Sequence, residues 1–90
     1  MRRAAKTDRN HAEIIAALRQ LGAEVLDLSP MGRGCPDLAV QFRGAITFLE
    51  VKGRRGRLTA DQVAFQRRWR VTVVRSVDEA LTAVRILAMR

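Results

Sequence analysis

The 90-residue chain is poor in the residues that build disulfides and histidine-centred sites. Cys35 is its only cysteine, which excludes an internal disulfide and a zinc site made of cysteines. His11 is its only histidine, so histidine-based metal or triad chemistry has no material. We interpret His11 as a solvated residue in the first turn of a helix.

Long apolar segments are missing as well. No run approaches the roughly 18–20 apolar residues of a membrane span, and no signal-peptide segment follows the charged N-terminus. These two absences predict a protein that stays in the cytoplasm.

A phosphate-binding P-loop is missing too. The loop 29–36 lacks its Gly-Lys-Ser/Thr end, which gives nucleotide hydrolysis little support.

Acidic residues are few beside the basic ones. Seventeen Lys and Arg stand against nine Asp and Glu, which gives a net charge of +8, and fifteen of the seventeen are arginine. Guanidinium groups suit bidentate phosphate contacts, so the imbalance predicts a polyanionic partner, most simply nucleic acid. With 48% apolar residues, the chain is a globular domain rather than a disordered basic tail.

Residues 1–9 carry basic side chains without helical or strand periodicity. We interpret this segment as a basic arm that becomes ordered on a phosphate backbone, although a solvated terminus explains it equally well. The remaining residues 10–90 contain no internal repeat, low-complexity tract or linker, so they form a single domain. The basic residues of the arm are Arg2, Arg3, Lys6 and Arg9.

The periodicity of the domain predicts alternating helices and strands. The first helix begins at an Asn-x-x-Glu capping box and ends before Gly22, and two later helices begin at boxes opened by Thr59 and Ser76. The Thr59 helix is expected to end before Trp69. Strands are expected at 24–28, in a hairpin within 36–52, and at 71–74. This order predicts an α/β sandwich with a mixed four-stranded sheet, in which an antiparallel meander is followed by a parallel fourth strand.

The hairpin brings charged side chains together. With an even-numbered loop at Arg43-Gly44, the cross-strand partners are Gln41 with Ile46, Ala39 with Phe48, and Asp37 with Glu50. Directly opposed residues share a face of the sheet, and Lys52, two positions beyond Glu50, points to that face too. The register therefore places two carboxylates and an ammonium side by side.

Two explanations account for this cluster. The second hairpin strand is apolar on both faces, which marks it as central, so an unneutralised carboxylate pair there would be costly to bury. Lys52 and nearby arginines could neutralise the pair in a structural ion-pair cluster. Alternatively, the carboxylate oxygens and the Val51 carbonyl could hold a hard divalent cation, Mg²⁺ or Mn²⁺.

Several motifs resemble one known family. Pro36-Asp37 followed by Glu50-Val51-Lys52 resembles the signature of PD-(D/E)XK nucleases. The segments 32–37, 50–53 and 58–62 (Gly-Arg-Gly-Cys-Pro-Asp, Glu-Val-Lys-Gly and Leu-Thr-Ala-Asp-Gln) resemble the VRR-NUC branch, in the short stand-alone form carried by phages and bacteria. The resemblance extends from about Asn10 to the last helix.

The resemblance implies a restriction-endonuclease-like αβββαβ core with a C-terminal helix. It also implies an Mg²⁺- or Mn²⁺-dependent deoxyribonuclease that cuts branched duplex DNA, such as four-way (Holliday) junctions, in a bacterial or phage-infected cell. A non-catalytic, basic nucleic-acid-binding module is the competing class. Basic charge supports both, but an Asp–Glu pair facing a polyanion would repel it unless a metal is present.

Roles follow from the family pattern residue by residue. Asp37 and Glu50 are expected to hold the metal together with the Val51 carbonyl. Lys52 is expected to orient or deprotonate the attacking water, or to offset charge in the transition state.

Two helical side chains each have two interpretations. Glu13 either returns to its own capping box or completes the metal coordination, as a helical glutamate does in related nucleases. Gln62 either closes its capping box or turns toward the site to orient water or phosphate.

Four arginines are candidate DNA contacts. Arg54, Arg55 and Arg57 form a basic loop beside the proposed metal, although such a run is also explained as solvated surface. Arg33 lies between two glycines, which would let the backbone approach a phosphate closely. The alternative is a tight connection that merely aims Asp37.

We also expect a symmetric homodimer. One domain of this size offers a single site, and paired cuts in a junction or duplex need two. The stand-alone proteins that the chain resembles are expected to act in this way. The apolar side of the last helix is the candidate interface, although coverage of the sheet explains it nearly as well; its residues are Leu81, Val84, Ile86 and Leu87.

Overall fold

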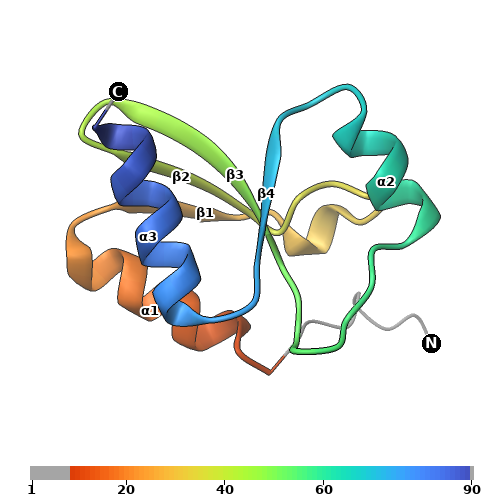
Figure 1. Ribbon diagram of the computed structural model, residues 1–90, viewed down its shortest axis with the longest axis horizontal. Helices are drawn as coiled ribbons and strands as arrows, with labels where there is room; N and C mark the ends of the chain where they lie inside the picture. The colour runs from red at the N-terminus through yellow and green to blue at the C-terminus, as the bar shows by residue number, and fades with distance from the viewer. Residues whose placement is uncertain (1–8, 90) are drawn as a thin grey trace.

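The computed structural model describes residues 9–89, so the predicted basic arm, apart from Arg9, lies outside the described residues. The described residues form three α-helices and four strands (Figure 1). They are α1 (His11–Leu21), β1 (Glu24–Asp27), a short 3₁₀ helix η1 (Ser29–Met31), β2 (Leu38–Phe42), β3 (Ala45–Val51), α2 (Ala60–Gln66), β4 (Val71–Val74) and α3 (Val77–Ala88).

The strands form one mixed sheet in the order β1-β2-β3-β4. The first three strands are antiparallel to their neighbours, and β4 lies parallel to β3 after the crossover through α2. The predicted α/β class and strand order are confirmed. Within residues 9–89, no helix is long and apolar enough to cross a membrane.

The β2–β3 hairpin has a two-residue turn, one of the even-numbered loops (two or four residues) that the predicted register allows. Arg43 and Gly44 both have positive φ, 52° and 82°, which is the conformation that matches the twist of a two-residue hairpin. Ala39 lies opposite Phe48, and Gln41 lies opposite Ile46. The predicted register is therefore confirmed for these two pairs, whereas Asp37 precedes β2 and is not paired with Glu50 in the β2–β3 ladder.

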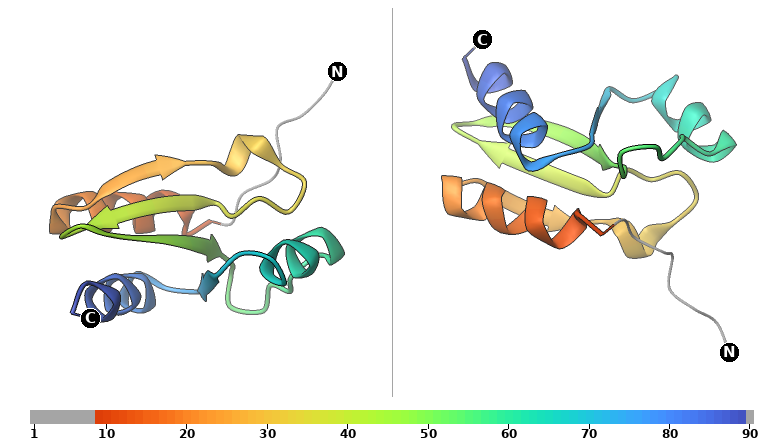
Figure 2. Two further views of the ribbon diagram at one scale, coloured as in Figure 1. Left: turned by 90° about the horizontal axis from the view of Figure 1, so that it is seen from above. Right: turned by 60° about the horizontal axis from the view of Figure 1, so that its bottom comes forward.

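The hydrophobic core lies between one face of this sheet and two helices, α1 and α3. These helices pack against each other at one side of the molecule, and α2 stands apart at the other side (Figures 1 and 2). Helical spacing at α1 and α3 and alternation along the strands bring the buried side chains together. They include Ile14 and Leu18 of α1, Val25 of β1, Leu38 and Val40 of β2, Leu49 and Val51 of β3, Val74 of β4, and Ala80 and Val84 of α3.

The predicted capping box at the start of α1 is wrong. The Asn10 side chain makes no cap hydrogen bond. Its Nδ2 atom instead donates to the carbonyls of Lys52, at 3.3 Å, and Arg75, at 3.0 Å. Asn10 thus ties the start of α1 to the ends of β3 and β4.

His11 is buried, contrary to the solvated interpretation. Only 7% of the residue is exposed, and its Nε2 atom lies 3.3 Å from Asp27 Oδ1. The same Asp27 oxygen accepts hydrogen bonds from the Ser29 amide and hydroxyl. The histidine therefore joins α1 to the end of β1.

The remaining local predictions are met to different degrees. Gly22 ends α1 in the left-handed conformation, as expected. The first strand stops at Asp27, and Leu26 faces outward with 65% exposure. At α3, Ser76 Oγ accepts from the Glu79 amide, but the Glu79 carboxylate accepts from the Arg75 amide rather than closing the box on Ser76.

Candidate active site

The two carboxylates of the predicted cluster lie where the hairpin strands end. Along β3, Leu49 and Val51 enter the core, so the alternating Glu50 side chain points to the opposite side. Glu50 is nevertheless only 2% exposed. Asp37 precedes β2, and its Oδ2 atom accepts a hydrogen bond from the Val51 amide at 2.8 Å. This bond holds Asp37 beside the end of β3.

Cys35 lies two residues before Asp37 and is half-buried. Burial raises the pKa of the Cys35 thiol, and the negative charges of Glu50 and Asp37 raise it further. A lone cysteine carries no spacing information, so sequence reasoning did not connect Cys35 with the carboxylates.

Lys52 lies beside Glu50, as the register predicts. Its Nζ atom is 3.8 Å from Glu50 Oε2, and its side chain is 12% exposed. The separation exceeds hydrogen-bond length, so the contact is electrostatic. Asp37 forms no ion pair within residues 9–89, which leaves the structural ion-pair cluster incomplete on that side.

Gln62 closes its capping box and also turns toward the site, while its role in orienting water or phosphate stays a prediction. Its Oε1 atom accepts from the Thr59 amide at 2.9 Å, while Thr59 Oγ1 accepts from the Gln62 amide at 3.2 Å. The side-chain Nε2 group then donates to Glu50 Oε2 at 2.9 Å. Because the capping box fixes the amide oxygen, the amide nitrogen is directed at Glu50.

The loop before Asp37 positions α2. Gly34 has a φ of 81°, and a Cβ atom there would overlap the Asp61 backbone. Only glycine allows the loop to lie this close to the start of α2, next to Gln62. This close approach to the protein supports the interpretation of the loop as a tight connection.

Glu13 lies in the first turn of α1, next to the buried Ile14. It is exposed, and no group of three or more His, Cys, Asp and Glu residues in the described part of the chain is arranged to hold a metal ion. A metal-binding role for Glu13 stays a prediction.

The oxygen atoms at the site suit a hard divalent cation. Asp37 and Glu50 supply carboxylates, and Val51 adds a backbone carbonyl next to them. Magnesium is typically bound through one or two carboxylates, with water and substrate phosphate completing its shell. This donor set fits Mg²⁺ or Mn²⁺ without further protein ligands.

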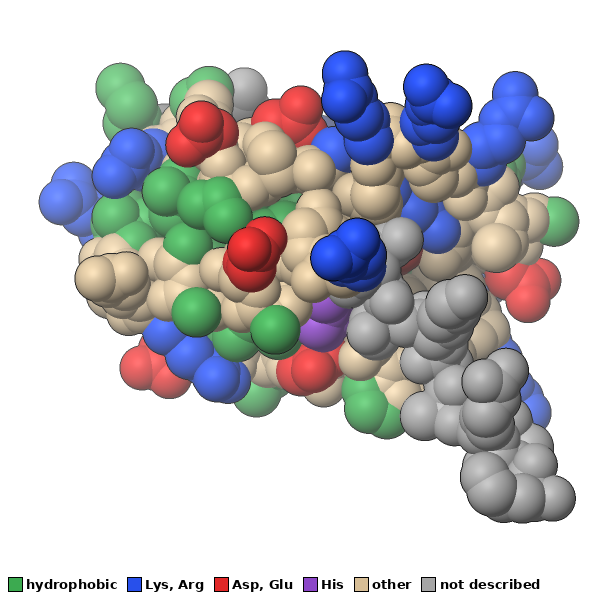
Figure 3. All heavy atoms as spheres, turned by 90° about the horizontal axis from the view of Figure 1, so that it is seen from below, with side chains coloured by type: hydrophobic (Ala, Val, Ile, Leu, Met, Phe, Trp, Pro, Cys, Tyr) green, Lys and Arg blue, Asp and Glu red, His purple; other side chains and the backbone are tan. Residues whose placement is uncertain are grey.

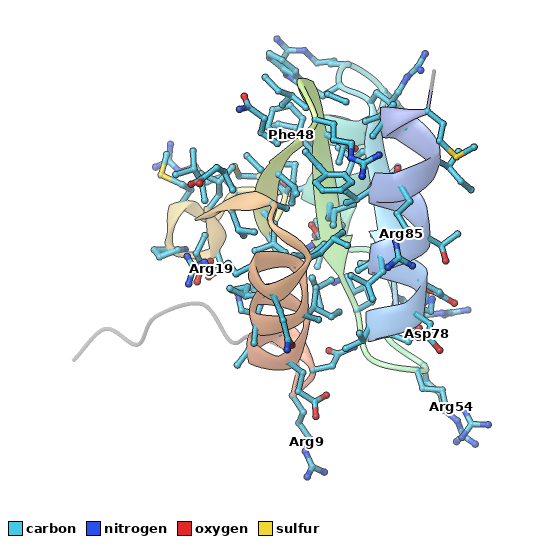
Figure 4. All side chains as sticks on the ribbon, turned by 90° about the vertical axis from the view of Figure 1, so that its left-hand side faces the viewer. Arg9, Arg19, Phe48, Arg54, Asp78 and Arg85 are labelled. Atoms are coloured by element: carbon cyan, nitrogen blue, oxygen red, sulfur yellow. The ribbon has the colours of Figure 1, made fainter. Side chains whose placement is uncertain are left out.

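A basic loop follows β3 directly. Arg54, Arg55 and Arg57 are exposed, and Arg54 projects from the same end of the molecule as Arg9 (Figure 4). Projecting Lys and Arg side chains are prominent along one side of the surface (Figure 3). Arg33, with a φ of 57°, is exposed in the other loop.

Arg75 holds the basic loop in shape, a role that sequence reasoning missed. Its Nη1 atom donates to the carbonyls of Gly53, at 2.8 Å, and Gly56, at 2.7 Å. The donor lies about twenty residues beyond the loop, and nothing in the local pattern marks it. The loop is therefore braced from the end of β4.

Comparison with known proteins shows a similar fold in one solved structure. No family model and no curated protein matches the sequence. A solved structure described as "VRR_NUC domain" is similar over 87% of this chain and 97% of its own, with 29% sequence identity and a TM-score of 0.66. The likeness thus extends through almost all of the described fold, and the resemblance predicted from the motifs is confirmed.

Proposed function

We propose that this VRR-NUC domain, whose restriction-endonuclease-like fold is of the nuclease type, is a metal-dependent DNA endonuclease. The observation that carries the proposal is the convergence of Asp37, Glu50 and Lys52 at the end of the hairpin. Asp37 is anchored on the Val51 amide, and Glu50 contacts both Lys52 and Gln62. Two carboxylates beside an ammonium group suit metal-assisted hydrolysis of a phosphodiester.

Each residue has a distinct task in this proposal. Asp37, Glu50 and the Val51 carbonyl would hold Mg²⁺ or Mn²⁺, which supplies a more acidic water and offsets charge on the scissile phosphate. Lys52 places a positive charge next to Glu50, where it orients the attacking water, takes its proton or offsets the developing charge. Gln62 fixes the orientation of the Glu50 carboxylate through its own capped amide.

Arg33, Arg54, Arg55 and Arg57 bind the phosphate backbone in this proposal. They are exposed, and the loop 53–57 directly follows the strand that carries Glu50. Replacing the three loop arginines by alanine should reduce the slope of log affinity against log salt by about 2 to 3, because each lost phosphate contact removes roughly 0.9. An unchanged slope would show that the loop is ordinary solvated surface.

The working unit in this proposal is a homodimer that makes paired cuts in branched DNA. Of the predicted interface residues, Val84 is buried in the core and Leu81 packs against it, so these two cover the sheet. Ile86 is 51% exposed and, with Leu87, lines an apolar groove of about 400 Å³ whose other wall includes Ile46. This groove is the part of the predicted interface that remains available to a second copy.

Light scattering should give a mass about twice the 10.1 kDa of one chain. An Ile86→Asp variant should fall to the mass of one chain, whereas the control Gln20→Asp, at an exposed position of α1 outside the groove, should not. A wild-type monomer that still makes paired cuts at low protein concentration would contradict the dimer.

The competing function is a basic module that binds DNA without cutting it. A panel of labelled four-way junctions, flaps, nicked duplexes and linear duplexes separates the two. The nuclease should cut at least one branched substrate in Mg²⁺ and only retard it in chelator. Retardation without any cleavage in Mg²⁺ or Mn²⁺ would favour the binding module.

A further inference from the structure

A small hollow lies beside the carboxylate site, between the loop before β2 and α2. Its volume is about 220 Å³, and none of its lining residues belongs to the predicted metal site. The hollow combines aromatic, cationic and acidic side chains, which are Arg33, Asp61, Ala64, Phe65, Arg68 and Trp69.

The aromatic wall of the hollow is held in place from two sides. The Trp69 ring stacks on Phe65, with centroids 5.9 Å apart and planes 21° apart. It also meets Phe48 of β3 edge to face, at 5.9 Å and 89°. Even so, Trp69 remains 51% exposed. A fixed, half-exposed indole is suited to stacking against a planar ligand, because little rotamer freedom is left to lose.

The charges of the hollow select among planar ligands. Arg33 and Arg68 line it, and the neighbouring Arg67 and Arg70 are exposed. Guanidinium groups beside an aromatic ring suit a base joined to a phosphate. The Asp61 carboxylate would weaken the binding of a bare phosphate but can accept a hydrogen bond from an amino group on a base edge.

We propose that this hollow binds one unpaired nucleotide of the DNA substrate. The inference rests on the proposed nuclease function and names its substrate class: DNA in which base pairing is interrupted next to the cut. Phe65 follows Gln62 by three residues, about 4.5 Å along the axis of α2. Because Gln62 contacts Glu50, an unpaired base in the hollow would lie close to the carboxylate site.

The intrinsic fluorescence of Trp69 tests the proposal directly, since it is the only tryptophan in the chain. The full chain is titrated in chelator, where no cleavage occurs, with a short oligothymidylate, an abasic oligonucleotide of equal length and a blunt duplex. We expect saturable quenching by oligothymidylate. The abasic oligonucleotide should bind at least about fivefold more weakly, because base–aromatic stacking is lost.

Variants separate the hollow from general charge. Arg68→Ala should weaken oligothymidylate binding severalfold, whereas Arg85→Ala, which removes an exposed arginine of α3, should change it less than twofold. Phe65→Leu should reduce the discrimination against the abasic oligonucleotide. If this variant has a lower unfolding temperature, the Arg68→Ala variant, at an exposed position, still tests the nucleotide site. Equal binding of abasic and base-containing oligonucleotides, or equal losses in the two arginine variants, would overturn the proposal.

The outcome is independent of whether the protein cleaves DNA. Quenching and base discrimination without cleavage of any branched substrate would support the nucleotide site and contradict the nuclease function. Cleavage of branched DNA without base discrimination would contradict the nucleotide site and support the nuclease function.

Discussion

The two sides of β3 have different partners. Leu49 and Val51 enter the core with α1 and α3, and both are at most 1% exposed. Phe48 and Glu50 alternate with them and meet side chains of the α2 region instead, Trp69 and Gln62. One strand thus joins a side that stabilises the fold to a side that carries the candidate chemistry. Substitutions one residue apart should therefore affect different properties.

The helices differ in the same way. The α1 and α3 helices, with 11 and 12 residues, bury apolar faces against the sheet and each other. The α2 helix has 7 residues and none of them is fully buried. Specific contacts hold it in place: the Thr59 box, the Gln62–Glu50 bond, the close approach of Gly34, and the ring of Trp69 on Phe48. An element held by so few contacts opens locally at lower free energy than the core.

The largest effect is expected on the chemical side. Asp37→Asn and Lys52→Ala should each lower the cleavage rate by about 1000-fold. Removal of one group that stabilises transition-state charge typically lowers an enzyme's rate by about 10²–10³-fold, and Asp37 would in addition be a metal ligand. The exposed control Asp78→Asn should keep its activity.

Thermal unfolding of the Asp37→Asn protein in chelator then separates the two explanations of the cluster. An unchanged or raised midpoint follows from relief of carboxylate repulsion. A clearly lowered midpoint would indicate the structural ion-pair cluster.

On the core side, Leu49→Ala should lower the free energy of unfolding by about 2–5 kcal/mol, because a fully buried side chain leaves a cavity. The control Leu26→Ala makes the same change on β1, where Leu26 is 65% exposed, and should change it by less than about 0.5 kcal/mol. Denaturant unfolding measures both. Equal losses in the two variants would contradict the assignment of Leu49 to the core.

Gly34→Ala should lower both the stability and the cleavage activity, because the added Cβ strains the backbone and pushes the loop away from Asp61. The left-handed conformation alone costs about 1–2 kcal/mol. The control Gly22→Ala shares that conformation with open space around it. Cleavage per folded molecule should fall in the Gly34 variant, because Gln62 moves with α2, and should persist in the control. Similar activities in the two variants would show that α2 does not position the site.

The smallest effect is expected for Asp27, on the stability of the fold at acidic pH. Partial burial acts to raise its pKa, but hydrogen bonds from Ser29 and His11 outweigh this and leave the pKa below its ordinary value. A lowered folded-state pKa stabilises the protein above the unfolded-state value and loses that contribution as the pH falls through the folded-state value. Asp27→Asn should therefore flatten the loss of stability below about pH 4. An acid-unfolding curve of unchanged steepness would exclude this contribution.

Features that depend on the periodicity of apolar residues can be predicted from the sequence. Hydrogen bonds between residues far apart in the chain cannot. Ile14, Leu18 and Val84 follow helical spacing, and the hairpin register follows from an even-numbered turn at Arg43-Gly44, so the core and the pairs of the β2–β3 ladder are predictable. Asn10 bonds to carbonyls 42 and 65 residues away, which no local pattern contains. The local sequence around Asn10 contains only the capping-box pattern, and this pattern led to the wrong prediction.

The candidate site shows the same limit. Gln62 reads locally as a capping residue, and the box indeed forms. Its second bond, to Glu50, depends on where the tertiary fold places α2. Glu13 shows it too: no cap hydrogen bond forms at Asn10, so the box that the local pattern offers Glu13 is absent, and its metal-binding role stays a prediction.

The central claim is that Glu50 serves the chemistry of a metal-dependent cut rather than the stability of the fold. Single-turnover cleavage of the preferred branched DNA, titrated with Mg²⁺, tests it with wild type and Glu50→Gln at equal amounts of bound DNA. The claim predicts Mg²⁺-dependent cleavage by wild type, a loss of about 1000-fold in the variant, and similar unfolding midpoints in chelator. A Glu50→Gln protein that cuts within tenfold of wild type would contradict it.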